Sequence, residues 1–302
     1  MSELHGVLSA MATPFTAGGE KVDEPALRAL TDRTLTAGVH GLVPCGSTGE
    51  FPALTDDERR AVTEIVIDQA AGRAPVIVHT GAMTTQQAAA LSRHAEQAGA
   101  AAIMVVPPYY EPLSTDEIGI YYRDVAASVG IDVMIYNLPM ATGVNMSPED
   151  IAALAADMPN IRYVKDTSGN FGQAAQLLHQ YGSALTTFVG WDTLYLGSLT
   201  EGARGSVIGA ANVVPGELVA IYDAIQGGDL TAARTVWDKI FPLMQFFMSG
   251  SYVAGIKSAL QFGEHAIGDP RLPIQPVRGP RLTELHTILT DISAQSPAGA
   301  RG

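Results

Sequence analysis

Residues 132–168 read DVMIYNLPMATGVNMSPEDIAALAADMPNIRYVKDTS and contain the pattern that decides the fold. Two apolar runs, at 132–139 and 161–168, flank an amphipathic stretch that begins at Ser147. Ser147 followed by Pro148 is a typical helix start, because serine caps the helix and proline fits its first turn. The segment therefore predicts a strand–helix–strand unit of about 30 residues.

The same unit recurs along the chain and predicts a (β/α)8 barrel. The other strand-like runs lie at 6–15, 41–46, 75–81, 101–108, 185–192 and 205–212. All are continuous rather than alternating, as expected for parallel strands covered on both faces. A doubly wound open sheet is the alternative, but no G-x-G-x-x-G follows a strand. We expect an α/β TIM barrel over residues 1–225 and a C-terminal helical extension over 226–302, packed together as one structural unit.

Composition and charge exclude several classes of partner. The 18 basic and 31 acidic residues give a formal net charge of −13, which disfavours nucleic acid and anionic membrane surfaces. No apolar run is long enough to span a bilayer. Cys45 is the single cysteine, so no disulfide framework and no structural zinc site are expected. The start of the chain has no basic segment before an apolar one, so we expect a cytoplasmic location.

Lys165 is the first candidate for catalysis. Active sites of such barrels lie at the C-terminal ends of the strands, and of the four lysines only Lys165 stands late in a predicted strand. A lysine there loses hydration, so its neutral amine becomes available to attack a ketone. The alternative is an ion pair with Asp166, although neighbouring strand residues point to opposite faces. Lys21, Lys239 and Lys257 fall in loops or helices, where solvated lysines are usual.

Two further features stand at the same predicted rim. Tyr136 ends the fifth strand, where it either packs in the core or carries protons for a Schiff base. GSTGE at 46–50 follows the second strand and is either an ordinary turn or a nest of N–H groups and hydroxyls that holds a carboxylate. No arginine stands at a predicted strand end, so an acidic substrate must be held by neutral donors.

Three motifs, at the ends of the second, fifth and sixth predicted strands, resemble those of a known family. GSTGE at 46–50, YNLP at 136–139 and VKDTSG at 164–169 are similar to the motifs of the dihydrodipicolinate synthase and N-acetylneuraminate lyase family of class I aldolases. The likeness covers nearly the whole chain. It implies a TIM-barrel lyase that joins a 2-oxo acid such as pyruvate to an aldehyde, or releases it. It also implies a covalent Schiff base on Lys165 and no metal or organic cofactor.

The resemblance assigns roles to individual residues. Tyr136 would shuttle protons, and Ser47 would hydrogen-bond into the tyrosine relay. Tyr110 matches the tyrosine that family members lend to a neighbouring subunit, which implies a homodimer or homotetramer. The implied substrate-binding residues are Gly46, Thr48, Gly49 and Thr167.

The sequence departs from both branches of this family. Dihydrodipicolinate synthases carry an arginine shortly after YN-x-P, where this chain has Met140 and Ala141. The lyases carry an Asp-Glu pair after strand seven, where this chain has Asp192 followed by Thr193. We expect Ala141 to line the aldehyde side of the site. Asp192 is expected either to contact a substrate hydroxyl or to cap the next helix.

The sequence thus favours a pyruvate-dependent aldolase whose aldehyde differs from that of dihydrodipicolinate synthase. Within the family the alternatives are 4-hydroxy-tetrahydrodipicolinate synthase itself and a 2-oxo-3-deoxy sugar acid dehydratase or aldolase, which shares the same enamine. From other classes, the alternatives are a metal- or phosphate-dependent barrel enzyme, for which Arg204 before Gly205 is the only hint, and a binding protein without catalysis.

Overall fold

Eight parallel strands form the centre of the molecule. The computed structural model describes residues 3–265 and 267–294. The strands are β1 (Gly6–Ala10), β2 (Gly41–Val43), β3 (Ile77–His79), β4 (Ala102–Val105), β5 (Asp132–Asn137), β6 (Ile161–Asp166), β7 (Thr186–Val189) and β8 (Gly205–Ile208). They pair in the order β2-β1-β8-β7-β6-β5-β4-β3, and a parallel bridge between Leu42 and Val76 joins the two ends. The predicted TIM barrel is confirmed.

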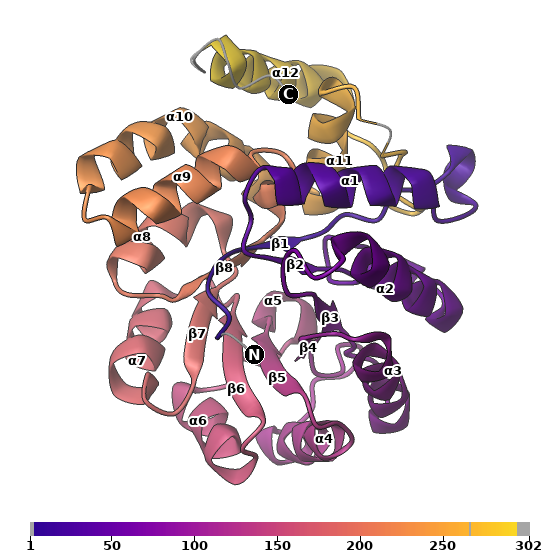
Figure 1. Ribbon diagram of the computed structural model, residues 1–302, viewed down its shortest axis with the longest axis vertical. Coiled ribbons are helices and arrows are strands. Elements are labelled where there is room, and N and C mark those ends of the chain that lie inside the picture. Colours follow the sequence, from indigo (N-terminus) through magenta and orange to yellow (C-terminus); the bar gives the residue numbers. More distant parts are fainter. Residues whose placement is uncertain (1–2, 266, 295–302) are drawn as a thin grey trace.

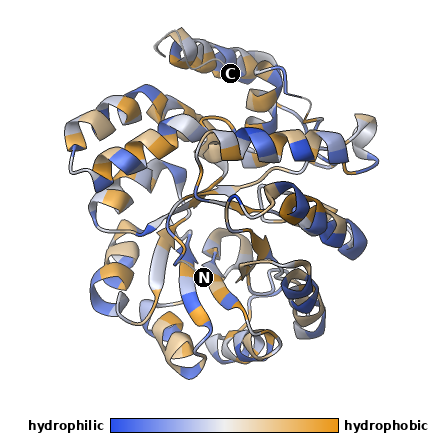
Figure 2. Ribbon diagram, viewed as in Figure 1, coloured by the Kyte–Doolittle hydropathy of each residue, from blue (hydrophilic) through white to orange (hydrophobic). Residues whose placement is uncertain are grey.

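Helices surround the strands (Figure 1). The helices of the ring are α1 (Glu24–Thr36), α2 (Asp56–Ala70), α3 (Thr85–Ala98), α4 (Thr115–Ala127), α6 (Pro148–Asp157), α7 (Phe171–Tyr181), α8 (Tyr195–Thr200) and α9 (Pro215–Gln226). Shorter helices in the connections are α5 (Pro139–Thr142), η1 (Ala17–Gly19), η2 (Phe51–Ala53), η3 (Asp192–Leu194) and η4 (Gly209–Asn212). Ser147 caps α6 as predicted, because its side chain accepts a hydrogen bond from the Asp150 N–H. The helices carry both hydrophobic and hydrophilic residues along their length (Figure 2), which suits one buried and one solvated face.

Three helices follow the barrel: α10 (Leu230–Met248), α11 (Tyr252–Phe262) and α12 (Gly279–Ala294). Helix α10 packs against α9 and α12, and α11 packs against η4 at the end of β8. Helix α12 lies at the outer edge of the molecule (Figure 1). The predicted extension runs to residue 302, and 295–302 lie outside the described residues. The division near residue 225 stays a prediction.

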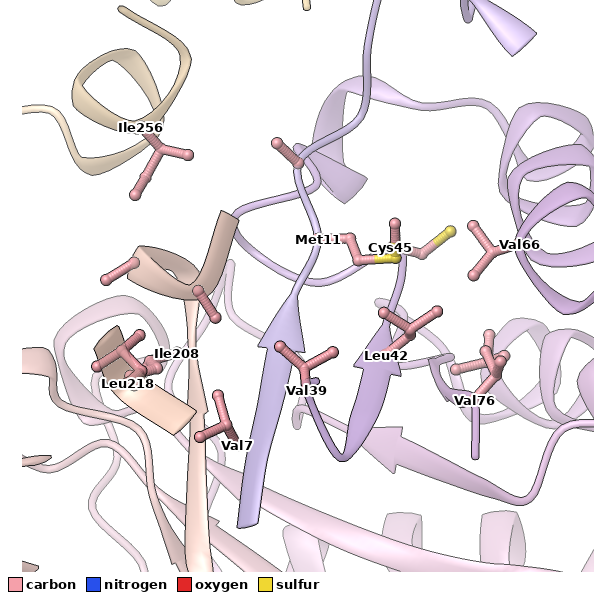
Figure 3. Close-up of a cluster of buried hydrophobic side chains, with 14 of the residues drawn as sticks. Val7, Met11, Val39, Leu42, Cys45, Val66, Val76, Ile208, Leu218 and Ile256 are labelled. Carbon is pink, nitrogen blue, oxygen red and sulfur yellow. The ribbon is translucent and has the colours of Figure 1, made fainter. Parts of the chain in front are cut away.

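The core has two layers, one on each side of the strands. The outer layer includes Leu42 of β2, which lies with Val66 of α2 between barrel and helices (Figure 3). The inner layer fills the barrel and includes Met104, Tyr163 and Phe188. Tyr163 stands two residues before Lys165 on β6, so this packing fills the barrel below the lysine.

The strands are shorter than the predicted apolar runs. Strand β2 ends at Val43 although its run extends to 46, and β8 ends at Ile208 although its run extends to 212. Residues 44–46 and 209–212 are nevertheless buried. The apolar runs therefore end where burial ends at the rim of the barrel, which is a few residues beyond the last residue that pairs with a neighbouring strand.

Closing the barrel between β1 and β8 requires a glycine at position 205. A Cβ atom on Gly205 would lie 2.1 Å from the backbone oxygen of Gly6. We expect Gly205→Ala to lower the free energy of unfolding by about 1–3 kcal/mol, because the two strands must move apart. Urea denaturation followed by circular dichroism measures the change.

Gly216→Ala is the matched control. Gly216 lies in α9 and has open space around it, so alanine there should leave stability unchanged or raise it slightly. Equal stability of Gly205→Ala and the unmodified protein would contradict the close approach of the two strands.

Candidate active site

A cavity of about 620 Å³ opens at the C-terminal ends of the strands. Its walls come from the ends of β1 and β5–β8, from the loop after β2, and from the extension at 247–252 and 271–274. The predicted site residues that line it are Ser47, Thr48, Tyr136, Ala141, Lys165, Thr167 and Asp192. The structure thus brings together predicted residues from four separate segments of the chain, at 47–48, 136–141, 165–167 and 192.

Lys165 points into the barrel and its neighbour points out. The Lys165 side chain is 5% exposed, and its Nζ lies 4.0 Å from the centre of the Tyr136 ring. A Cβ atom on Gly190 would lie 2.5 Å from Lys165 Cε. The absence of a side chain at Gly190 therefore provides the space that the lysine side chain occupies. Asp166 instead accepts hydrogen bonds outside the barrel from Asn137 (2.9 Å) and Ser168 (2.8 Å). The alternative of a Lys165–Asp166 ion pair is therefore wrong.

Tyr136 links the lysine to the loop after β2. Its side chain is 3% exposed, and its hydroxyl lies 3.3 Å from Ser47 Oγ, a hydrogen bond in which either group is the donor. His79 packs edge-on against the Tyr136 ring, with 6.2 Å between ring centres. Burial lowers the pKa of His79 well below its usual value, so this neighbour adds no positive charge.

The GSTGE loop holds polar groups toward the cavity. Cys45 and Glu50 bracket it in the left-handed region, with φ of 59° and 57°. Thr48 is buried at the cavity wall, and among the described residues the backbone N–H groups of Thr48 and Gly49 donate to no acceptor within the chain. Thr13 Oγ1 donates to the Gly49 carbonyl at 2.8 Å, which fixes the loop. This arrangement of unused N–H groups fits an anion.

Asp192 is buried at the opposite wall. Its two carboxylate oxygens each accept from the Tyr252 hydroxyl at 2.8 Å, and one also accepts from the Ala210 N–H at 3.2 Å. Burial raises the pKa of the Asp192 carboxyl to about 6, against the opposing effects of Tyr252, Ala210 and the nearby Lys165 charge. The side chain makes no capping hydrogen bond to η3, so of the two expectations for Asp192 the cap is wrong.

A buried ion pair anchors the loop from below. Lys257 Nζ lies 2.6 Å from Glu50 Oε1, and both side chains are 1% exposed. Glu50 also accepts from the backbone N–H of Arg271 at 2.8 Å. The expectation that Lys257 is a solvated lysine is wrong. The loop is thus fastened to α11 and to the segment that precedes α12.

Three residues singled out in the sequence lie away from the cavity's polar groups. Tyr110 is 88% exposed, in the β4–α4 connection, and does not line the cavity. Ala141 lies in α5 at the exposed edge of the cavity. Arg204 precedes β8, and its guanidinium lies 3.7 Å from Glu3. Arg204 therefore stands at the far end of the barrel, and the phosphate site that it suggested is wrong.

Residues 3–265 and 267–294 contain no group of three or more His, Cys, Asp or Glu side chains that is suited to holding a metal ion. Within the same residues no helix is long and apolar enough to cross a membrane. The cytoplasmic location stays a prediction.

The chain is similar to known proteins over almost all of its length. The sequence model of the dihydrodipicolinate synthetase family matches residues 3–292. The chain belongs to this family. A 4-hydroxy-tetrahydrodipicolinate synthase of Sorangium cellulosum (strain So ce56) is 38% identical over 273 residues, which are 90% of this chain and 91% of that protein.

Solved structures of the dihydrodipicolinate synthetase family have the same fold. Dihydrodipicolinate synthase from Aquifex aeolicus superposes with a TM-score of 0.92 at 30% identity, over 96% of this chain and 98% of that chain. A prophage protein of the family from E. coli K12, solved in complex with pyruvate, has a TM-score of 0.92 at 31% identity, over 97% and 99% of the two chains. The predicted family and enzyme class, a lyase of the class I aldolase type, are confirmed.

The sequence did not identify three residues that line or support the cavity. They are Tyr252, Lys257 and Arg271, all in the extension. One signal was available: Lys257 lies within the apolar stretch YVAGIKSALQF, where a single charge calls for a buried partner. Nothing in the sequence identifies Glu50 as that partner, because the two residues are far apart along the chain.

The buried Asp192 carboxyl should make stability depend on pH. Its pKa rises on folding from 3.8 to about 6, so the folded state holds the proton more tightly. The resulting stabilisation is complete below about pH 4 and is lost as the pH rises through 6, a change of roughly 3 kcal/mol. We expect the free energy of unfolding of the unmodified protein, relative to Asp192→Asn, to fall by this order between pH 4 and 7 in urea denaturation.

Asp124→Asn, which removes an exposed carboxyl of α4, controls for the loss of one charge. If the difference in the free energy of unfolding between the unmodified protein and Asp192→Asn stays constant from pH 4 to 7, the raised pKa of Asp192 is contradicted.

Proposed function

We propose that the protein is a pyruvate-dependent aldolase that binds its 2-oxo acid as a Schiff base on Lys165. The observation that carries this is the buried Lys165 amine beside Tyr136, which in turn lies 3.3 Å from Ser47. An amine in a largely apolar barrel attacks the ketone carbon of the acid, and the departing oxygen leaves as water. The bound carbon chain then loses a proton to give an enamine.

Tyr136 is the proton carrier of this scheme. Formation and collapse of the carbinolamine each need a proton at the ketone oxygen, and the Tyr136 side chain lies against the lysine, with 4.0 Å between Lys165 Nζ and the centre of the ring. Ser47 extends the relay toward the cavity. The lysine itself supplies the electron sink, so the proposal requires no metal or organic cofactor.

The loop after β2 is the proposed carboxylate site. The N–H groups of Thr48 and Gly49 and the Thr48 hydroxyl provide neutral donors, and the Gly46 carbonyl accepts a hydrogen bond from the Phe51 N–H, which closes the loop. Thr167 lines the cavity beside Lys165, and its buried hydroxyl has no hydrogen-bond partner, which suits contact with a substrate oxygen. The 2-oxo acid is thus held at both ends, by a covalent bond and by the loop.

The curated relatives support one named alternative. They are described as 4-hydroxy-tetrahydrodipicolinate synthases, and at 38% identity that activity is the second candidate for this chain. A 2-oxo-3-deoxy sugar acid dehydratase or aldolase shares the same first steps and stays the third. The three candidates differ in the aldehyde or sugar acid, and share the Schiff base on Lys165.

We further propose that the protein works as a homodimer or homotetramer. Tyr110 carries a large aromatic side chain that is 88% exposed. Tyrosine is enriched in protein–protein interfaces relative to the rest of the surface, which supports a contact role. In an assembly it would reach the site of a neighbouring subunit.

Reduction with borohydride in the presence of pyruvate should trap an adduct on Lys165. The Schiff base forms only at an amine that reaches the bound ketone, and the other lysines lie outside the cavity. Intact-mass spectrometry and peptide mapping detect the adduct. Lys165→Arg is the control and should give none; an adduct on Lys239 or Lys257 would overturn the proposal.

Tyr136→Phe should lower kcat by roughly 10²–10⁴, the usual contribution of a positioned acid–base group. The change keeps the ring against Lys165 and removes only the hydroxyl that lies beside Ser47. Steady-state kinetics measure kcat and KM separately, and KM for the 2-oxo acid should change less because the loop still binds its carboxylate. Near-normal kcat would place the proton carrier elsewhere.

A further inference from the structure

The cavity is larger than a three-carbon acid requires, and its outer half is apolar. At about 620 Å³ it falls in the range of sites that take a drug-sized ligand. The apolar side chains of its lining include Leu138, Met140, Trp191, Phe247, Leu272 and Ile274. Met140 and Leu272 are 72% and 74% exposed, on different walls of the cavity. These side chains are apolar surface that a second substrate would cover.

Arg271 lines the same cavity but has no donor to offer a substrate. A guanidinium has five N–H donors. In Arg271, Nε donates to the Gly19 carbonyl, Nη1 to the Ala53 carbonyl and Glu58, and Nη2 to Glu58 and the Glu20 carbonyl. All five are therefore used within the chain, and the charge is paired with that of Glu58.

The remaining charges of the cavity wall also oppose a second anion. Lys165 is committed to the Schiff base. Glu50 is paired with Lys257, and Asp192 is held by Tyr252, so both carboxylates stay in place beside the substrate. A carboxylate on the aldehyde would lose water without gaining a charge-assisted hydrogen bond.

We propose that this site takes an uncharged aldehyde with an apolar body as the acceptor for the pyruvate-derived enamine. This inference rests on the proposed function. Carbon 3 of the enamine forms a bond with the aldehyde carbon, and the aldehyde oxygen takes up one proton. Water then hydrolyses the iminium, frees Lys165 and releases a 4-hydroxy-2-oxo acid.

A matched pair of aldehydes tests the inference on the purified full-length protein. With pyruvate held constant, initial rates of product formation are measured by mass spectrometry for benzaldehyde and 4-carboxybenzaldehyde, with aspartate semialdehyde as a third acceptor. We expect kcat/KM for benzaldehyde to exceed both others by about ten- to a hundredfold, the effect of one missing charge-assisted contact. A carboxylated aldehyde that matches or exceeds benzaldehyde overturns the inference.

A pair of variants asks whether charge is the cause. Ala141→Arg places a cation at the exposed edge of the cavity, and Ala141→Gln adds an uncharged side chain that also bears N–H donors. The arginine should raise kcat/KM for 4-carboxybenzaldehyde relative to benzaldehyde at least several-fold, and the glutamine should not. If both substitutions raise this ratio of kcat/KM values equally, or if neither changes it, the inference is contradicted.

Borohydride trapping with pyruvate alone, on the same preparation, distinguishes failure of the proposed function from failure of the inference about the acceptor. Absence of an adduct on Lys165 rejects the proposed function. An adduct on Lys165 together with a preference for carboxylated aldehydes leaves that function standing and rejects the apolar acceptor.

Discussion

The ion pair between Glu50 and Lys257 is the contact on which the geometry of the site depends. Removing two charges from water costs roughly several kcal/mol for each ion, so the pair persists only where the surrounding structure fixes both partners. Glu50 ends the loop after β2 in a left-handed conformation that is strained for a residue with a side chain. Lys257 lies on α11, five residues after Tyr252, which holds Asp192. This buried ion pair, together with the hydrogen bond from the Arg271 N–H to Glu50, therefore joins the loop after β2 to the extension.

The alternation of side chains along β6 divides the polar groups of the rim into two sets. Lys165 faces the cavity, where no fixed counter-ion touches its amine. Asp166 faces the helices, where Asn137, Ser168 and Gln173 satisfy its carboxylate. If the strand were shifted by one residue, the two side chains would exchange faces, and the lysine would point toward the helices instead of into the cavity. The inner packing of Tyr163 and Phe188 on neighbouring strands fixes this register.

The sequence predicted the barrel and the inner face of the site well, because both depend on local patterns. Continuous apolar runs marked all eight strands. The position of Lys165 late in one of these runs predicted that its side chain lies at the C-terminal end of the barrel, where it lines the cavity. The contribution of the extension was not predictable, because Tyr252 and Lys257 meet their partners only through tertiary packing. The predicted helix cap by Asp192 was wrong for the same reason. Its actual partner is the Tyr252 hydroxyl, which lies 60 residues away along the chain. The strand ends were also misjudged, since burial continues past the last paired residue.

The charges of the cavity explain how an acidic protein handles an acidic substrate. In the proposed scheme the iminium on Lys165 carries a positive charge into a low-dielectric site, and the carboxylate of the 2-oxo acid lies beside it as counter-charge. Asp192 is close enough to sense the Lys165 charge, and above a pKa of about 6 it adds a second negative charge. The covalent intermediate is thus balanced within the inner half of the cavity. Arg271 is paired with Glu58 and Lys257 with Glu50, so in residues 3–265 and 267–294 no basic side chain that lines the cavity, apart from Lys165, is free to meet a second anion. In the proposed scheme, selection between acceptors depends on desolvation, since an apolar body gains free energy by leaving water and a second anion loses it.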